Sequence, residues 1–389
     1  MSADDLEPPD WSSWVTACNE ATRAADRWRA PRDLEGGRPA SRLVAAGEPG
    51  RDVISFASND YLGLSQHPAP IAAAIEAVAR LGTGSGASRL VVGSRPEHTA
   101  LEASLAEWKT SEAAVLFPTG YAANLGVITT LATPGVLVCS DELNHASIID
   151  GCRLARADAA VYPHGDLDAL AGLLRQAADQ GRRALVVSDL VFSMDGDAAA
   201  VDDLVALAHT HGAALVLDEA HAVFGPEPHD VPDDLLLVRV GTLSKTLGSL
   251  GGFVAAPRGV CDLLVNRART YIFTTAPSPA DTAAAGAALE VLTGTEGAAL
   301  LGHLRALVGR LRPGHPSPIV PVVVGAEADA LALSAALLDR GLLVPAIRPP
   351  TVAPGTSRLR IAVSAAHTDE QVAALEAALD ALHPAWRDT

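Results

Sequence analysis

The 389-residue sequence predicts an α/β protein with a mostly parallel central sheet in a large domain, followed by a smaller α+β domain. Two observations lead to this fold class. Between residues 51 and 279, short apolar runs bounded by turn residues alternate with helical patterns, which is typical of parallel strands covered by helices on both faces. From about Pro279 onward, a long alanine-rich helix is followed by fewer strands. We therefore expect an N-terminal segment over residues 1–50, a large domain over 51–279 and a small domain over 280–389.

Each expected element has its own pattern. Apolar residues from Trp14 to Trp28 recur at the spacing of one helix face, which predicts an N-terminal helix ended by Pro31. The strands expected in the large domain are the apolar runs at residues 53–57, 114–117, 136–139, 184–187 and 213–217. The elements expected in the small domain are helices over 280–293, 331–338 and 369–382 and strands over 319–324 and 359–363.

Composition limits the possible partners. The formal net charge is −17, and a chain this acidic repels phosphate backbones and anionic membranes, so we expect neither nucleic acid nor membrane as a partner. The four cysteines are scattered without a Cys-x-x-Cys pair, which argues against a zinc ribbon or a disulfide framework. Residues 1–7 lack the pattern of a signal peptide, and no uninterrupted apolar run reaches roughly 18 residues, the length of a membrane span. These features predict a cytoplasmic protein.

Lysine is rare in this chain, which has 29 basic residues but only two lysines. Lys245 lies in the glycine-rich segment 241–252, where backbone can approach a small molecule closely. A lysine amine can lose its proton and form a Schiff base with an aldehyde, whereas arginine cannot be deprotonated. Lys109 ends a helical apolar stripe, and we expect its amine to lie in water.

Polar side chains follow several of the predicted strands. Asp218 comes directly after one strand and is followed three residues later by His221; His145 follows a second strand and Ser193 a third. In open α/β sheets, ligands bind beyond the carboxyl ends of the strands. We therefore expect these side chains to meet at one end of the sheet.

A fourth strand leads into a candidate anion site. Gly120 and Tyr121 form a tight turn after the run at 114–117 and open a helix. Free backbone N–H groups and the helix dipole make such a turn a suitable site for a phosphate group. Together these residues meet the needs of an aldehyde cofactor on a pyridine ring: an amine, an acid for the ring nitrogen, a flat group over the ring and a phosphate site.

A helicase-like interpretation is weaker. Residues 218–221 spell Asp-Glu-Ala-His, the Walker B sequence of one helicase group, and residues 241–246 faintly match a phosphate-binding P-loop. A P-loop has Gly directly before its Lys, whereas Ser244 stands there, and the two motifs occur in reversed order.

A zinc site is also disfavoured. Asp218 and His221 would need His209 or His211 as further ligands, but these two histidines precede the strand and should lie at its opposite end. We therefore expect no metal.

Eight segments together resemble the α-oxoamine synthases, which are pyridoxal-phosphate enzymes of fold type I. The resemblance runs from about Trp11 to the last helix, and its segments are residues 58–64, 84–90, 144–151, 191–197, 218–221, 242–245, 348–352 and 355–360. The resemblance implies the cofactor pyridoxal 5′-phosphate. It identifies Lys245 as the Schiff-base lysine and the base for the substrate α-proton, and Asp218 as the carboxylate on the pyridine nitrogen.

The remaining cofactor contacts are also implied by the resemblance. His145 corresponds to the imidazole stacked over the ring, and Ser193 and His221 to the partners of the phenolic oxygen. Gly120, Tyr121 and Thr242 correspond to the phosphate site, to which Thr274 or Thr275 of a partner subunit adds a contact.

Four residues are expected at the substrates by the same resemblance. Asn59 and Arg348 correspond to the groups that hold the amino-acid carboxylate, for which a guanidinium fork is well shaped. Thr351 lies in the same segment as Arg348 and is expected at the substrate site. Arg29 is expected to meet the far carboxylate of a dicarboxylic acyl chain.

Residues 88–90, Ser-Arg-Leu, resemble the family members that act in biotin biosynthesis. These enzymes form homodimers and condense L-alanine with a pimeloyl thioester of CoA or of a carrier protein, releasing carbon dioxide and the thiol and giving 8-amino-7-oxononanoate. The alternatives are 5-aminolevulinate synthase, 2-amino-3-ketobutyrate CoA ligase, an enzyme of a specialised pathway and a non-catalytic partner subunit. The presence of Lys245 argues against the last of these.

One segment departs from the family pattern. The family has Gly after the Asp-Glu-Ala-His sequence and then a longer glycine-rich loop, whereas residues 222–228 read Ala-Val-Phe-Gly-Pro-Glu-Pro here. This difference affects the expected substrate entrance more than the chemistry.

Overall fold

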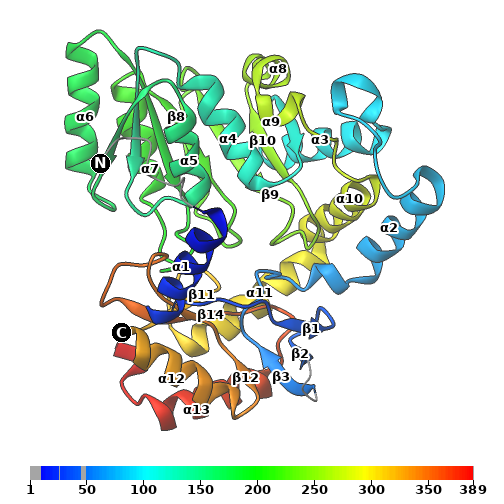
Figure 1. Cartoon of the computed structure of the whole chain (residues 1–389). Helices are drawn as coiled ribbons and strands as arrows, with labels where there is room; N and C mark the ends of the chain where they lie inside the picture. Colours follow the sequence, from blue (N-terminus) through cyan, green and yellow to red (C-terminus); the bar gives the residue numbers. More distant parts are fainter. Residues whose placement is uncertain (1–9, 26, 45–49, 389) are drawn as a thin grey trace.

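The computed structural model describes residues 10–25, 27–44 and 50–388, so the acidic residues 1–7 lie outside the described part. A seven-stranded sheet forms the centre of the larger of two bodies (Figure 1). Its order is β4-β10-β9-β8-β7-β5-β6, and within it only the two pairs that β10 makes are antiparallel. The strands are β4 (Ala113–Phe117), β5 (Val136–Asp141), β6 (Asp158–Tyr162), β7 (Arg183–Asp189), β8 (Ala214–Asp218), β9 (Leu237–Thr242) and β10 (Gly252–Ala256). The expected mostly parallel central sheet is confirmed.

Helices cover both faces of this sheet because successive strand residues point to opposite sides. In β7, Val187 joins a core that includes Ile128, whereas Val186 joins a second core that includes Leu170. The helices on the first face are α4 (Gly120–Leu131), α5 (Ala146–Leu154), α8 (Arg258–Arg267) and α9 (Arg269–Ile272), and those on the second are α6 (Leu167–Asp179) and α7 (Val201–Thr210).

The smaller body contains two sheets with helices beside them. One sheet has the order β11-β14-β13 and the other the order β1-β2-β3-β12. The strands are β1 (Asp33–Glu35), β2 (Ala40–Val44), β3 (Arg51–Ser55), β11 (Ile319–Gly325), β12 (Leu342–Leu343), β13 (Ala346–Ile347) and β14 (Ser357–Ala362). The helices here are α11 (Thr295–Leu311), α12 (Glu327–Leu338), α13 (Asp369–Leu382) and the short η4 (Trp386–Asp388). Strand β3, which we expected to open the large domain, pairs in parallel with β12.

Three further helices pack together along one side of the molecule (Figure 1). They are α2 (Pro68–Leu81), α3 (Pro96–Trp108) and α10 (Pro279–Thr293). The short η2 (Leu64–Gln66) precedes α2, and the short η3 (Arg89–Gly93) lies between α2 and α3. Proline at the first position of α10 and the Ser278 cap, whose hydroxyl accepts from the Asp281 N–H, fix the start of that helix.

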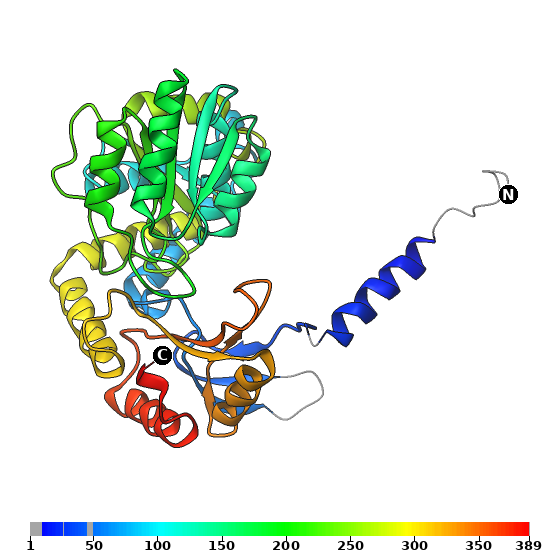
Figure 2. The same ribbon diagram turned by 90° about the vertical axis from the view of Figure 1, so that its left-hand side faces the viewer.

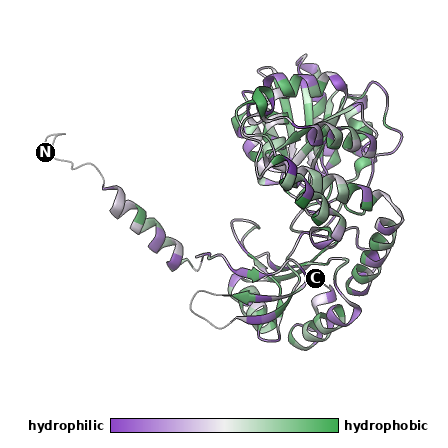
Figure 3. Cartoon of the chain, turned by 90° about the vertical axis from the view of Figure 1, so that its right-hand side faces the viewer, coloured by the Kyte–Doolittle hydropathy of each residue, from purple (hydrophilic) through white to green (hydrophobic). Residues whose placement is uncertain are grey.

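Helix α1 (Trp11–Ala24) extends away from both bodies (Figure 2). The side chain of Asp10 caps it by accepting from two backbone N–H groups, and the helix ends well before Pro31, where we expected it to end. None of its residues is buried, although hydrophobic and hydrophilic residues are both present along it (Figure 3). Its apolar side chains, such as Trp11 and Trp14, are therefore exposed in the part of the chain that the structure describes.

The expectation that the amine of Lys109 lies in water is wrong. The side chain is only 4% exposed, and its Nζ lies 2.6 Å from Glu219 and 3.5 Å from Glu227. Arg239 of β9 pairs with the same two carboxylates. Burial of the lysine is possible because two cations and two carboxylates are gathered in one cluster.

Within the described ranges, no helix combines the length and the apolar composition needed to cross a bilayer.

Candidate active site

A cavity of about 240 Å³ lies at the carboxyl ends of the central strands and gathers most of the residues expected at the cofactor. Its walls come from the ends of β7 and β8, the starts of α4 and α5 and the loop after β9. The lining residues are Thr119, Gly120, Tyr121, Asn124, His145, Ser147, Asp189, Asp218, Ala220, His221, Thr242, Ser244 and Lys245.

Lys245 projects from the loop between β9 and β10, and its Nζ lies 2.8 Å from His221 Nε2. The glycines of this loop allow close packing. At Gly248, where φ is +60°, a Cβ atom would lie 2.3 Å from the backbone nitrogen of Ser65. Burial lowers the pKa of the Lys245 amine below its ordinary value, and the charge of Asp218 opposes this shift. A lysine with a lowered pKa supplies a free amine more readily than an exposed one.

Asp218 ends β8 with both carboxylate oxygens occupied. One oxygen accepts from the Ala220 N–H at 2.9 Å, and the other accepts from the Asn124 side-chain amide at 2.6 Å. The amide of Asn124 also donates to Ser147 at 2.9 Å. These bonds hold the carboxylate in a fixed position on the cavity wall. The sequence does not reveal Asn124 as a site residue, because no sequence pattern connects the second turn of α4 to the end of β8.

A second carboxyl group, Asp189, stands on the same wall. It is buried at the end of β7, and burial followed by the charge of Asp218 raises its pKa well above the ordinary value. One of its oxygens accepts from the backbone N–H of His145 at 3.0 Å. This bond ties the start of α5 to the end of β7.

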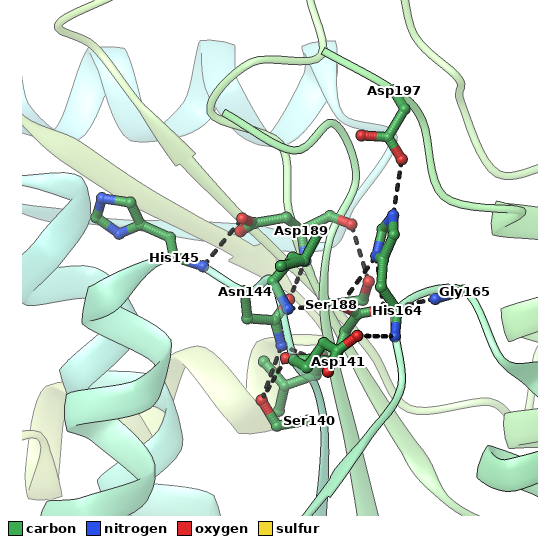
Figure 4. Close-up of polar contacts among 12 residues, drawn as sticks. Ser140, Asp141, Asn144, His145, His164, Gly165, Ser188, Asp189 and Asp197 are labelled. Atoms are coloured by element: carbon green, nitrogen blue, oxygen red, sulfur yellow. Dashed lines mark hydrogen bonds and ion pairs between the residues drawn. The ribbon is translucent and has the colours of Figure 1, made fainter. Parts of the chain in front are cut away.

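His145 caps helix α5, and its Nδ1 accepts from the Ser147 N–H at 3.2 Å while the Ser147 hydroxyl lies 2.7 Å away. Burial lowers the pKa of the imidazole. Figure 4 shows the ring projecting away from Asp189, while the backbone nitrogen of His145 faces that carboxylate. The arrangement presents a flat ring to the cavity.

The residues expected to form an anion site lie close together at the start of α4. Thr119 is the N-cap, and its hydroxyl accepts from the Ala122 N–H at 3.0 Å. The hydroxyl of Thr242 lies 2.7 Å from that of Ser244, across from the helix start. A Cβ atom at Gly120 would lie 3.2 Å from the Thr242 side chain, so the glycine permits this close approach. Hydroxyls and a helix N-terminus thus face one space, as phosphate binding requires.

A chain of hydrogen bonds runs from Lys245 towards the smaller body. The other ring nitrogen of His221 lies 2.5 Å from the Tyr61 hydroxyl, and this hydroxyl donates to Asn59 Oδ1 at 3.2 Å. Arg360 of β14 donates to the same Asn59 oxygen at 3.1 Å. Burial, followed by the charge of Lys245, lowers the pKa of His221 well below its ordinary value, and burial raises the pKa of Tyr61 to about 12. The imidazole and the phenol are therefore both neutral near pH 7.

The expected site list also missed Tyr61 and Arg360. Both lie inside segments that resemble the family, so the signal was available, but Arg348 was chosen as the guanidinium. Arg360 is buried, and it joins Asn59 to the backbone oxygen of Ser193, which accepts from its Nε at 2.5 Å.

Ser193 and Thr351 line a second cavity of about 720 Å³ between the two bodies. One wall carries Phe192 and Met194, and the facing wall is the segment 349–354. The larger body and the smaller body therefore both contribute to this space.

Four expected residues line neither cavity. Asn59 is half-buried and is connected to Lys245 through the hydrogen bonds of Tyr61 and His221. Arg29 and Thr275 are exposed, and Arg348 is half-buried between β13 and the cavity segment that begins at Pro349. None of these last three residues lines the cavity that contains Lys245.

The sheet is mostly parallel and has seven strands, and a lysine, a carboxylate and a helix N-terminus lie at its carboxyl edge. This combination identifies the family to which the protein belongs. The chain belongs to the family described as aminotransferase class I and II, whose model matches residues 51–379.

Within that family, its curated relatives are similar over nearly their full lengths. The chain is 49% identical to the 8-amino-7-oxononanoate synthase of Alkalilimnicola ehrlichii, over 92% of this chain and 95% of the relative. It is 51% identical to the enzyme of the same name from Anaeromyxobacter dehalogenans, over 86% of this chain and 87% of the relative.

Solved structures share the fold along the whole chain. Serine palmitoyltransferase from Sphingomonas wittichii is 31% identical, with a TM-score of 0.86 over 97% of this chain and 99% of that chain. The S. paucimobilis enzyme with a bound PLP–myriocin aldimine is 31% identical, with a TM-score of 0.87 over 98% of this chain and 100% of that chain. The 8-amino-7-oxononanoate synthase of Francisella tularensis, at 24% identity, has the same fold with a TM-score of 0.71 over 85% of this chain and 98% of that chain. Fold type I is thus the fold of this protein.

Proposed function

We propose that this protein is a pyridoxal-phosphate-dependent acyltransferase that condenses L-alanine with a pimeloyl thioester and releases carbon dioxide, the thiol and 8-amino-7-oxononanoate. The observation that carries this proposal is the joint presence of Lys245, Asp218 and His145 around one cavity in a chain about half identical to synthases of that name. The reaction belongs to biotin biosynthesis, and we place it in the cytoplasm.

The residues around the cavity fit pyridoxal 5′-phosphate. Lys245 supplies the amine for its aldehyde, Asp218 the negative charge for its ring nitrogen, and His145 the flat group over the ring. His221 and Ser193 are proposed to meet the phenolic oxygen. When bound, the cofactor supplies an electron sink for the charge that develops on the substrate α-carbon.

The phosphate group is proposed to lie at the start of α4. Gly120 and Tyr121 supply backbone N–H groups, and Thr242 supplies a hydroxyl. Thr275 would add a contact from a partner subunit, which agrees with its exposure on this chain and its absence from this chain's own cavity.

Lys245 is proposed to move the proton in the reaction. Its lowered pKa favours the neutral amine, which takes the α-proton of L-alanine at Nζ and later returns a proton to the product. The neighbouring His221 stays neutral because of burial, so it does not compete as a cation for the nearby carboxylates.

The amino-acid carboxylate is proposed to bind near Asn59 and Arg348. Asn59 is already held by the buried guanidinium of Arg360, which provides a second cation beside the same site. The acyl chain is proposed to lie in the larger cavity, beside Thr351, with Arg29 meeting its far carboxylate.

We also propose a homodimer. Large apolar side chains remain exposed on this chain, and α1 extends from the body with no buried residue. A second copy would cover these surfaces and would bring Thr275 to the neighbouring site.

The test uses the purified protein with pyridoxal 5′-phosphate, L-alanine or glycine, and pimeloyl-, succinyl- or acetyl-CoA, with thiol release as the measurement. We expect turnover to be dominant with L-alanine and pimeloyl-CoA. Borohydride reduction followed by peptide mapping should place the cofactor on Lys245, and Lys245→Ala should lose both the adduct and the turnover. Dominant turnover of glycine with succinyl- or acetyl-CoA would overturn the substrate assignment, and an unmodified Lys245 would overturn the chemistry.

A further inference from the structure

His164 lies between two carboxylates just outside the candidate site (Figure 4). Its Nδ1 lies 3.0 and 3.2 Å from the two oxygens of Asp141, and its Nε2 lies 2.9 Å from Asp197. The ring meets Phe192 edge-on, with 4.3 Å between the centroids. The residue belongs to the turn between β6 and α6, which supplies no residue to either cavity described above.

The two carboxylates belong to the two loops that present His145 and Ser193. Asp141 ends β5 and accepts from the Leu143 N–H at 2.9 Å, at the start of the turn that leads to His145. Asp197 closes the segment that carries Ser193, and its backbone oxygen accepts from the Phe192 N–H at 3.0 Å. His164 therefore joins two segments that are distant in sequence.

The loop over residues 192–197 is held on its other side by the smaller body. Arg358 of β14 pairs with Asp195, and the Ser317 hydroxyl donates to the backbone oxygen of Gly196 at 2.7 Å. Gly196 has a φ of +71°, and a Cβ atom there would lie 2.0 Å from the Ile319 oxygen. Only a glycine fits, so the path of this loop is narrowly determined. His164 is the contact that ties the loop to the end of β5.

The contacts require a charged imidazole. Both ring nitrogens face carboxylate oxygens, and each can interact favourably only by donating a hydrogen, which makes the ring an imidazolium. The hydrogen bonds to Asp141 and Asp197 raise the pKa of His164 to about 10, although burial opposes this shift. The charged groups facing this residue are Asp141, Asp197 and Glu142. The side chain of Glu142 accepts from the backbone N–H of His164 at 2.9 Å. The net charge around the imidazolium is therefore negative.

We propose that His164 is a positioning residue, which clamps the His145 turn to the Ser193 loop and so sets how these two side chains meet the cofactor. This inference rests on the proposed function, because it takes the cofactor to be the molecule that both side chains touch. His164 itself lines neither cavity and takes no part in proton transfer.

The experiment compares His164→Gln, Asp197→Asn and the double variant with wild type. The measurements are the dissociation constant of pyridoxal 5′-phosphate from the apo-protein, the induced circular dichroism of the bound cofactor, and kcat and KM for L-alanine. His209→Gln is the matched control, because His209 also pairs with an aspartate, Asp234 at 3.1 Å, but lies near the opposite end of the sheet.

We expect His164→Gln to weaken cofactor binding by about tenfold, the scale of one lost charge-assisted hydrogen bond, and to change the induced dichroism. The fall in activity should lie mainly in kcat. The effects in the double variant should be close to those of His164→Gln alone, because both substitutions break the same contact. His209→Gln should match wild type in all three measurements.

Two results would overturn the proposal. In the first, His164→Gln lowers the unfolding midpoint but leaves cofactor affinity and dichroism as in wild type, which would make the residue merely structural. In the second, the effects of the two single substitutions simply add, which would show that the clamp does not exist. Failure of the proposed function is distinguishable, because it would appear in the wild-type protein as cofactor binding without turnover of L-alanine.

Discussion

Lys245 and Lys109 are the only two lysines of the chain, and their surroundings differ at the scale of single residues. Lys245 lies beside a neutral imidazole in a cavity, whereas Lys109 is enclosed by Glu219, Glu227 and Arg239. The carboxylates around Lys109 balance the charge of its buried ammonium group. Through its pair with Glu219, this lysine stabilises the segment that directly follows β8. Glu219 directly follows Asp218, and so the cluster also fixes the segment that carries Asp218.

Replacing Lys109 by Met should therefore destabilise the protein. The change leaves two carboxylates with one buried cation, and breaking a buried pair in this way costs about 3 kcal/mol. Urea unfolding of the variant, read by far-ultraviolet dichroism, measures the loss. The control is Arg153→Met, which breaks the exposed pair with Asp150 at 3.2 Å and should change the free energy of unfolding by less than about 0.5 kcal/mol. An equal effect of the two substitutions would contradict the role of burial.

One physical difference explains why the position of Lys245 could be predicted from the sequence, whereas the amine of Lys109 was wrongly expected to lie in water. Lys245 could be recognised from its local glycine-rich segment and from the strand end that supplies Asp218. The burial of Lys109 depends on Glu219 and Arg239, which come from strands far along the chain, and a local apolar stripe carries no information about them. Asn124 was missed for the same reason, since it acts through a partner from another element.

At the scale of elements, the clamp at His164 predicts a pH dependence of stability. The folded-state pKa of about 10 lies above the ordinary histidine value of 6.5, so protonation favours the folded state. The stabilisation is fully present below about pH 6.5, declines as the pH rises, and disappears above about pH 10. The difference in unfolding midpoint between wild type and His164→Gln should follow this course between pH 6 and 10. A difference that grows with pH would contradict the assignment.

The strands that the sequence predicted in the large sheet are unbroken apolar runs. β7 and β8 are such runs, and both were expected within two residues of their observed ends. β9 was not expected, because Arg239 interrupts it, and that side chain is buried only through its pairs with Glu219 and Glu227. β6 was not expected either, because it is an edge strand with mostly exposed residues. Edge position and buried charge are both tertiary properties.

At the scale of the whole molecule, the two bodies are not simple sequence segments. Strand β3 precedes the large sheet in sequence but pairs with β12 in the smaller body, next to β2. Pairing between strands that are so far apart in sequence depends on the tertiary path of the chain. Hydrophobic periodicity is a local property and cannot reveal this pairing. One consequence is that Asn59, shortly after β3, lies beside Arg360 of β14, which is distant in sequence.

A last prediction follows from the proposed homodimer. Turn η3 exposes Leu90, Val91 and Val92 by 52%, 71% and 70%, and the exposed Phe273 directly follows helix α9, which contacts this turn. We expect these exposed apolar side chains to contact a second copy. Val91→Asp would place a charge in that contact, so the variant should sediment as one chain of 39.9 kDa and lose activity.

Val161→Asp is the control, since Val161 is 66% exposed on the edge strand β6 away from this surface. This variant should keep both the sedimenting mass and the activity of the wild type. A wild-type protein that already sediments as a single chain while turning over its substrates would contradict the shared site.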